Sequence, residues 1–332
     1  MARFLIIGDC QHFVGITQNI ASALQSFDNE VSVFDTIGDF CCNKSLNSSI
    51  IDTAIAYKPD IVFFIRNETI HYSTLQIIKK QCSATLAAWW LDDPLISFGK
   101  DELFVHQNNY ESIRFFDYLF VFDSFHIPRL RRIGCPNVHL LPCAYNPHEY
   151  FPQEVTEEEH AYYGSDVSFI GTPYTDRGRI LAQLLNYNIK LWGGKWSNPR
   201  IAEHTVKDTL ITTEECRTIF FSSAINLVLP QVQSVHGYNQ SLFQALGSQG
   251  FIIAPFLNDI EKYGLQKDHD IVTYETIDEL KSKIDYYLTR PNERLRIARN
   301  GYTSVLRNHT YKNRAKEVCS VLGISSVQYT AN

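Results

Sequence analysis

The stretch SVHGYNQSLFQALGSQGFIIAP, residues Ser234–Pro255, constrains the fold more than any other part of the chain. Just before it, the apolar run 225–230 predicts a buried strand that ends at a proline, which has no N–H for a central ladder. A polar loop, 231–239, leads to a helix, and two glycines end that helix before a second apolar run, 251–254. This order of strand, loop, helix and strand predicts a unit of an α/β sheet.

The loop 231–239 occupies a place where such sheets bind anions. It follows the carboxyl end of a strand and feeds the first turn of a helix, where unpaired N–H groups and the helix dipole favour negative charge. Asn239 or Ser241 is expected to cap the helix, and Gly237 is free to take a positive φ in the loop. The sequence therefore predicts a phosphate site at the start of this helix.

These residues resemble the donor-site segment of GT-B glycosyltransferases, and most closely that of the CgeB-like (spore-maturation) family. Two positions depart from the family, because Ser241 replaces an arginine and Gln244 stands where the ribose-binding glutamate is expected. His236 occupies the place of a second glutamate of related retaining enzymes. A glutamine can both donate to and accept from a ribose hydroxyl, so the resemblance still implies a nucleotide-diphospho-sugar donor, and a UDP-sugar is the first expectation. The two departures imply either a lower affinity for this donor or a different donor. The positions shared with the family are Asn239, Phe243, Ala245, Gly250 and Phe251.

The N-terminal half alternates apolar runs with helical patterns. No G-x-G-x-x-G follows the first run, so the fingerprint of an NAD(P)- or FAD-dependent oxidoreductase is missing. Strand and helix repeated at this spacing predict parallel βαβ units and a doubly wound sheet. The six runs are 3–8, 30–35, 60–65, 84–91, 117–122 and 137–142.

Further phrases extend the resemblance to the CgeB-like family along the chain. In the first half these are WWLDDP at 89–94, FDYLFVFDS at 116–124 and LLPCAYNPHEYFP at 140–152. In the second half they are DVSFIG at 166–171 and the segment 291–314. The resemblance implies an α/β fold of the GT-B type, with two Rossmann-like, doubly wound parallel-sheet domains facing a cleft and C-terminal helices that cross back.

We expect four segments along the chain. Residues 1–150 should form a Rossmann-like acceptor domain, and the acidic, proline-containing segment 151–165 a linker. Residues 166–308 should form a Rossmann-like nucleotide-sugar domain. The last segment, 309–332, is expected to be a helix that packs back towards the N-terminal domain.

Candidate catalytic residues lie in two loops of the first half. Asp9 and His12 follow the first strand, where inverting GT-B enzymes often place a general base, and a histidine can take the acceptor's proton at neutral pH. Asp92 and Asp93 end a buried strand, and because adjacent side chains point to opposite sides, one of the two should reach a ligand. If the reaction inverts, His12 or Asp93 is the base; if it retains, the leaving phosphate can take the proton. The alternatives are an ordinary loop histidine and an aspartate that caps the turn before Pro94.

More donor-site candidates lie in the second half. Gly171 and Thr172 stand between a strand and a helix N-terminus, where they can meet phosphate, and Arg177 or Arg179 can add a cation for the donor diphosphate. An arginine in a first helical turn opposes the dipole, so unless Arg177 is on the surface it should have an anionic partner. The complete set of nucleotide-sugar candidates is Gly171, Thr172, Arg177, Gly193, Lys195, His236, Gly237, Tyr238, Asn239, Gln240, Ser241 and Gln244.

Composition limits the possible partners. The 332 residues suffice for two domains, and a hydrophobic content of 45% with 20% charged residues is typical of a globular protein. A net charge of −6 without a basic cluster argues against a nucleic-acid partner. The eight cysteines contain no C-x-x-C, and they are expected to be reduced thiols of a cytoplasmic protein. The apolar run near the N-terminus is too short for a signal sequence, and no membrane span is expected.

The expected function is transfer of a sugar from a nucleotide-diphospho-sugar to a glycan, protein or small-molecule acceptor. The resemblance implies that no metal and no further cofactor is required, as is general for GT-B enzymes. One alternative is a catalytically inert nucleotide- or glycan-binding member of the family, suggested by His236 and Gln244. Another is a nucleic-acid-base glycosyltransferase, which the acidic charge disfavours.

Overall fold

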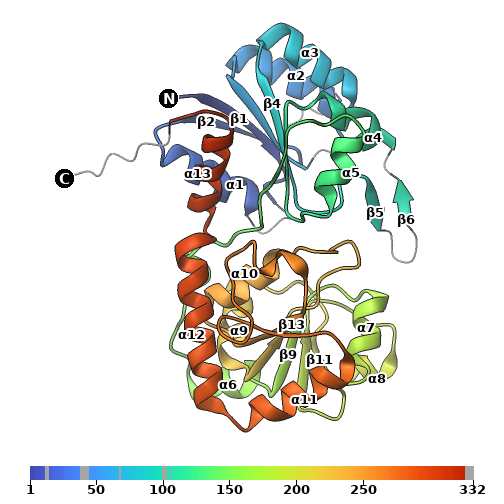
Figure 1. The fold of residues 1–332 in the computed structure, drawn as a ribbon, viewed down its shortest axis with the longest axis vertical. Coiled ribbons are helices and arrows are strands. Elements are labelled where there is room, and N and C mark those ends of the chain that lie inside the picture. The colour runs from blue at the N-terminus through green and yellow to red at the C-terminus, as the bar shows by residue number, and fades with distance from the viewer. Residues whose placement is uncertain (12–14, 38–44, 67–68, 99–102, 106, 326–332) are drawn as a thin grey trace, which may run out of the picture. The chain divides into compact units, whose positions relative to one another are not determined.

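The structure is a computed structural model that describes residues 1–11, 15–37, 45–66, 69–98, 103–105 and 107–325. The chain forms two compact units (Figure 1). The N-terminal unit comprises Met1–Pro142 and the segment from Tyr311 onward, and the C-terminal unit comprises Cys143–Thr310. In the described part of the chain, no helix is both long enough and apolar enough to cross a membrane.

A six-stranded parallel sheet forms the centre of the N-terminal unit, in the order β2-β1-β3-β4-β7-β8. Its strands coincide with the six apolar runs of the sequence, and the middle strand β3 is buried at every residue. A short antiparallel hairpin, β5–β6, was not expected. The strands are β1 (Arg3–Gly8), β2 (Glu30–Asp35), β3 (Ile61–Ile65), β4 (Thr85–Trp90), β5 (Ile96–Phe98), β6 (Leu103–Val105), β7 (Tyr118–Val121) and β8 (Val138–Leu140).

Helices flank this sheet. The last one, α13 (Tyr311–Val321), packs beside α1, so the expected return of the C-terminal helix to this unit is confirmed. The fully buried Arg314 holds it there, because its Nε donates to Pro142 O at 2.7 Å. The other helices are α1 (Ile16–Gln25), α2 (Leu46–Tyr57), α3 (Tyr72–Cys82), α4 (Gln107–Ser112) and α5 (His126–Arg132).

The C-terminal unit has a second six-stranded parallel sheet, in the order β11-β10-β9-β12-β13-β14. The strand–loop–helix–strand unit expected from the sequence is present as β12, α10 and β13. Both sheets are therefore doubly wound, as predicted. The strands are β9 (Val167–Ile170), β10 (Ile189–Trp192), β11 (Thr205–Lys207), β12 (Ile225–Leu227), β13 (Ile252–Pro255) and β14 (Val272–Tyr274).

The helices of this unit include one in the segment expected to be a linker. There the acidic run forms α6, which begins with a capping box between Thr156 and Glu159 and buries none of its residues, as suits a solvated face. The helices are α6 (Glu157–Tyr163), α7 (Thr175–Leu181), α8 (Pro199–Ala202), α9 (Thr213–Ser222), α10 (Gln240–Gly247), α11 (Ile277–Leu288) and α12 (Pro291–Asn308).

Candidate functional site

The carboxyl edge of the C-terminal sheet gathers most of the donor-site candidates. Its switch point lies between β9 and β12, since the chain leaves β9 for β10 and β11 and returns on the other side through β12 to β13 and β14. Ligands of open parallel sheets bind at such a point. Gly171, Gly193 and Val228 directly follow β9, β10 and β12 at this edge.

Two glycines stand directly after β9 and β10. Gly171 N donates to Trp192 O at 3.0 Å. Gly193 has a φ of +91°, which side chains of L-residues rarely permit, and a Cβ there would lie 3.5 Å from Gly171 N. The surface between these strand ends is therefore made of backbone, as the sequence suggested for close approach of a ligand.

Arg177, in α7, hydrogen-bonds the two loops that flank the switch point. Its side chain is buried, its Nε donates to Leu229 O at 2.8 Å, and its Nη1 donates to Thr172 O at 3.0 Å. Leu229 lies beyond the end of β12 and Thr172 beyond the end of β9, so one guanidinium ties the two loops together. Burial lowers the pKa of Arg177 to about 10, and Asp176 partly offsets this effect. Both of these hydrogen bonds go to neutral carbonyls.

Tyr238 anchors the loop before α10 to the end of β13. This residue is fully buried, and its hydroxyl donates to Pro255 O at 2.6 Å, at the end of β13. His236 O accepts a hydrogen bond from Asp259 N at 2.9 Å, so the backbone is held on both sides of Gly237. Gly237 is buried and does not use the positive φ that a glycine permits, because the neighbouring anchors shape the loop.

The N-terminus of α10 lacks a side-chain cap. Asn239 stands at the N-cap position, but its Oδ1 accepts a hydrogen bond from Ser241 Oγ at 2.6 Å and none from a backbone N–H. No acidic residue lies in the first turn, which begins at Gln240. Because the first N–H groups of any helix have no acceptor within the helix, this end of α10 suits an anion.

Gln244 lies one turn further along α10, on the same helical face as Gln240. It is 8% exposed, and its Nε2 is buried without a hydrogen-bond partner in the described part of the chain. Buried amide groups of native proteins are almost always hydrogen-bonded. The position that the family resemblance gives to ribose binding therefore holds a donor that lacks an acceptor.

Of the two candidate residues after β10, one lies on the surface and the other in the core. Lys195 is exposed. Trp196 is 6% exposed and packs against Phe169, with 6.2 Å between ring centroids. Of the two, only Lys195 is accessible to a ligand.

In the N-terminal unit, a cavity of about 210 Å³ lies at the carboxyl ends of β1, β3 and β4. Asp9 and Arg66 line it. Asp9 Oδ1 accepts from Gln11 N at 2.7 Å, and Asp9 O accepts from Thr17 Oγ1 at 2.8 Å. Arg66 has a φ of +63°, uncommon for a residue with a side chain, and its Nη1 lies 3.1 Å from Asp92 Oδ2. This edge of the sheet thus presents both a carboxylate and a guanidinium.

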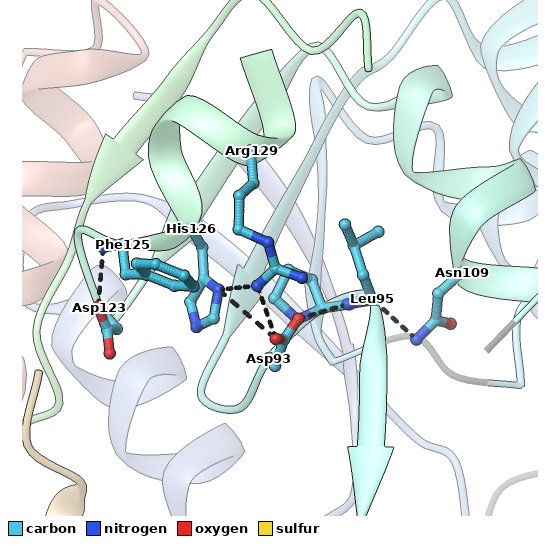
Figure 2. Close-up of polar contacts among 8 residues, drawn as sticks. Asp93, Leu95, Asn109, Asp123, Phe125, His126 and Arg129 are labelled. Atoms are coloured by element: carbon cyan, nitrogen blue, oxygen red, sulfur yellow. Dashed lines mark hydrogen bonds and ion pairs between the residues drawn. The ribbon is translucent and has the colours of Figure 1, made fainter. Parts of the chain in front are cut away.

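Asp93 belongs to a separate buried polar cluster (Figure 2). Its Oδ2 lies 2.7 Å from Arg129 Nη1 and 3.8 Å from His126 Nδ1, and its Oδ1 accepts from Leu95 N at 2.9 Å. Asp92 and Asp93 therefore have different partners, as the alternation of side chains predicted. The turn-capping role considered for this pair is present at Asp93, together with an ion pair.

Arg129 also contacts His126, because its Nη1 lies 3.0 Å from His126 Nδ1. His126, Arg129 and Arg66 were not among the candidates from the sequence. Arg66 directly follows an apolar strand, where polar residues line the carboxyl edge, and this signal could have found it, whereas His126 and Arg129 lie in α5. The remaining candidate, His12, lies outside the described residues.

Comparison with known proteins agrees with the architecture. Residues 177–320 match a family described as glycosyl transferase-like. No curated protein sequence matches the chain.

Solved structures resemble the whole chain at low sequence identity. A sucrose-phosphate synthase from Thermosynechococcus elongatus is 11% identical with a TM-score of 0.70, over 97% of this chain and 98% of that one. HepE from Anabaena, solved in complex with UDP-glucose, is 9% identical with a TM-score of 0.68, over 97% and 100%. A glycosyltransferase from Rickettsia africae is 11% identical with a TM-score of 0.65, over 98% and 99%. The chain therefore has the GT-B fold, and the greater part of its C-terminal unit matches the glycosyl transferase-like family.

Proposed function

We propose that the protein is a glycosyltransferase that uses a nucleotide-diphospho-sugar, first of all a UDP-sugar, and transfers the sugar to a hydroxyl of a glycan, protein or small-molecule acceptor. The observation that carries this proposal is the pairing of an uncapped N-terminus of α10 with the partnerless amide of Gln244 on the same helix. The glycosyl transferase-like match of residues 177–320 and the UDP-glucose complex of the similar HepE structure support it.

The diphosphate would bind at the start of α10. Gln240 and Ser241 supply the first N–H groups of the helix, and Asn239 does not cap them. Gly171 and Gly193 have no side chains, so phosphate oxygens can closely approach the backbone at the neighbouring strand ends. As the bond to the sugar breaks, negative charge grows on the leaving diphosphate, and these fixed dipoles stabilise it. Arg177 has the role of a positioning residue, since its guanidinium holds both loops of the edge.

The ribose would bind at Gln244. A ribose hydroxyl that accepts from Nε2 supplies the partner that this buried amide lacks. A glutamate there would accept from the hydroxyl in a charge-assisted bond, which is stronger than a bond to a neutral amide. We therefore infer that the native Gln244 binds the donor less tightly than a glutamate would. His236, Gly237, Tyr238 and Lys195 complete the proposed donor site as the flanking loop and its rim.

In the reaction, the acceptor oxygen bonds to the anomeric carbon while the bond from that carbon to the diphosphate breaks. If the configuration inverts, a base takes the acceptor proton, and Asp9 is the better candidate of the two described carboxylates because it lines a cavity. Asp93 is engaged by Arg129 and by Leu95 N. If the configuration is retained, the leaving phosphate takes the proton. In either course we propose that helix N–H groups act in place of a metal.

Thermal unfolding with UDP, GDP, CMP, dTDP and their sugar conjugates tests the donor site. One nucleotide at 100 times its dissociation constant should stabilise the wild type by about 2.7 kcal/mol. Gln244→Ala should lose most of this gain and Gln244→Glu should increase it, whereas Gln183→Ala, at an exposed position of the same unit, should respond as the wild type does. Absence of a response to every nucleotide contradicts the proposal, as does an equal response of the Gln244 variants. Unchanged turnover in the presence of EDTA would support metal independence.

A second candidate is an inert nucleotide-binding protein, and Gln244 in place of the expected glutamate favours it. The two functions differ in release of free nucleotide from the sugar conjugate when acceptors are supplied. Binding without release by the wild type, and release by Gln244→Glu, would identify a binding protein that has lost its activity.

A further inference from the structure

The C-terminal unit contains a second cavity, of about 650 Å³, at the edge of the sheet opposite to the proposed donor site. Asp166, Asn188, Ala224 and Phe251 line it, and these residues stand directly before or within one residue of the starts of β9, β10, β12 and β13. Since all strands of a parallel sheet begin at the same edge, the cavity is separate from the carboxyl edge. Its size is typical of a site for a small molecule, for which roughly 300–1,000 Å³ is usual.

Two half-buried cations, Lys190 and Arg294, line this cavity, and each has N–H groups that make no hydrogen bond within the described part of the chain. Lys190 Nζ donates to two carbonyls near the end of α6, at 2.9 and 2.7 Å, and an ammonium has a third N–H. Arg294 Nη1 donates to two carbonyls at the end of α11. Its Nε and Nη2 have no hydrogen-bond partner in the described part of the chain. Burial lowers the pKa of both side chains, and Asp166 partly offsets this effect at Arg294.

A buried hydroxyl adds a further donor. Ser222 lines the cavity, is 7% exposed, and its Oγ has no partner among the described residues. The exposed Asp166 is the one carboxylate among the lining residues. The two cations Lys190 and Arg294 therefore outnumber the one carboxylate in the lining, and the ligand that matches this excess of positive charge is an acceptor with negative charge.

We propose that this cavity is a second ligand site, which binds a small molecule bearing a phosphate or a carboxylate through Lys190, Arg294 and Ser222. The oxyanion would accept from the remaining N–H groups of the two cations and from the serine hydroxyl. The rest of the ligand would occupy the remaining volume, beside the half-exposed Leu295. This site is independent of the nucleotide and of the proposed transfer reaction.

Helix capping explains part of the geometry, because Lys190 and Arg294 each bond the last carbonyls of a helix. Capping accounts neither for their remaining donors nor for Ser222. It also makes a different prediction: loss of the cation would lower stability without changing any response to an anion. Ser222 has no capping bond, so its truncation separates the two explanations.

The experiment is thermal unfolding of the full chain titrated with inorganic phosphate and, separately, with citrate, at constant ionic strength and with UDP present to occupy the proposed donor site. The melting temperature of the wild type should rise with one of the two anions. Lys190→Gln, Arg294→Gln and Ser222→Ala should each weaken the apparent affinity, by about tenfold or more for the two cations, since each charge-assisted bond contributes that much. The matched control is Arg296→Gln, which removes the same charge from an exposed position of α12 outside the cavity lining.

An equal anion response in the wild type and in all three cavity variants would overturn the proposal, as would the absence of any response in the wild type. A response to phosphate alone identifies a phosphorylated ligand, and a response to citrate alone a carboxylated one. Because Gln244→Ala acts only at the other edge, it should leave this response unchanged whether or not the proposed transfer reaction is correct.

Discussion

At the scale of single residues, the ion pair of Asp93 and Arg129 should contribute to stability. Asp93 is 8% exposed and the Arg129 side chain is 22% exposed, so the pair lies in a partly desolvated place. Removing Arg129 costs more than the pair itself contributes, because the Asp93 carboxylate stays buried and keeps the hydrogen bond from Leu95 N but loses the guanidinium.

We expect Arg129→Met to lower the free energy of unfolding by about 2–3 kcal/mol, below the full cost of a completely buried pair because Arg129 is partly exposed. The double variant Asp93→Asn/Arg129→Met should recover part of this loss. The control is Lys79→Met, which breaks an ion pair with Asp117 but removes a side chain that is 48% exposed, and should cost less than about 1 kcal/mol. Urea unfolding measures all three. Equal losses for Arg129→Met and Lys79→Met would contradict this account of Asp93.

The sequence located the candidate site better than it described its contacts. Positions after apolar strands and in a helix follow from local pattern, and so Gly171 and Gly193 lie after strands and Gln244 lies in a helix, where the sequence placed them. Their partners are set by tertiary structure: Arg177 reaches a carbonyl 52 residues away, and Asp93 pairs with a residue 36 positions away. No local pattern contains these distances along the chain, which is why an anion was expected beside Arg177.

At the scale of elements, the parallel strands were predictable because both faces of each sheet are covered and the strands read as continuous apolar runs. The elements that were missed are shorter or more polar. α6 buries no residue and is held by its capping box, and β5 and β6 have three residues each. Helix α9 carries two glutamates in its first turn and a capping box, a signal that the sequence did contain.

Close packing between α10 and α12 depends on a glycine inside a helix. A Cβ on Gly301 would lie 2.4 Å from Asp270 O and 2.7 Å from Leu246 Cδ2, and the first of these is a backbone atom that cannot rotate away. We expect Gly301→Ala to destabilise the protein by about 1–3 kcal/mol through overpacking, although alanine is the better helix former.

Gly178 provides the matched control in α7. A Cβ there meets its nearest neighbour, Trp196, at 3.5 Å, which is an ordinary contact. Gly178→Ala should therefore stabilise by about 0.5–1 kcal/mol through helix propensity alone. Equal signs for the two substitutions in chemical denaturation would show that packing does not decide the outcome at Gly301.

At the scale of the whole molecule, the C-terminal unit depends on buried tyrosines. Burial raises the pKa of Tyr145, Tyr238 and Tyr274 well above the usual value near 10. In the unfolded chain these hydroxyls lose their protons above pH 10, whereas in the folded protein they keep them. Their contribution to stability is therefore complete below pH 10 and is lost as the pH rises towards the folded values. Arg177 acts in the opposite direction, because its folded pKa of about 10 is lowered by burial and the unfolded chain then holds the extra proton.

The tyrosines whose pKa is raised, which also include Tyr150, outnumber the three cations whose pKa is lowered, Arg177, Lys190 and Arg294, so the free energy of unfolding should fall above pH 10. Each tyrosine contributes a slope of about 1.4 kcal/mol per pH unit. The Tyr274 hydroxyl is buried without a hydrogen-bond partner among the described residues, so Tyr274→Phe should keep the fold and reduce the slope by that amount. Tyr110→Phe changes a side chain that is 44% exposed and should leave the slope as it is. Urea unfolding at a series of pH values from 9 to about 11 measures this, and stability that stays constant above pH 10 would contradict the assignment of the buried tyrosines as the groups that set the alkaline limit.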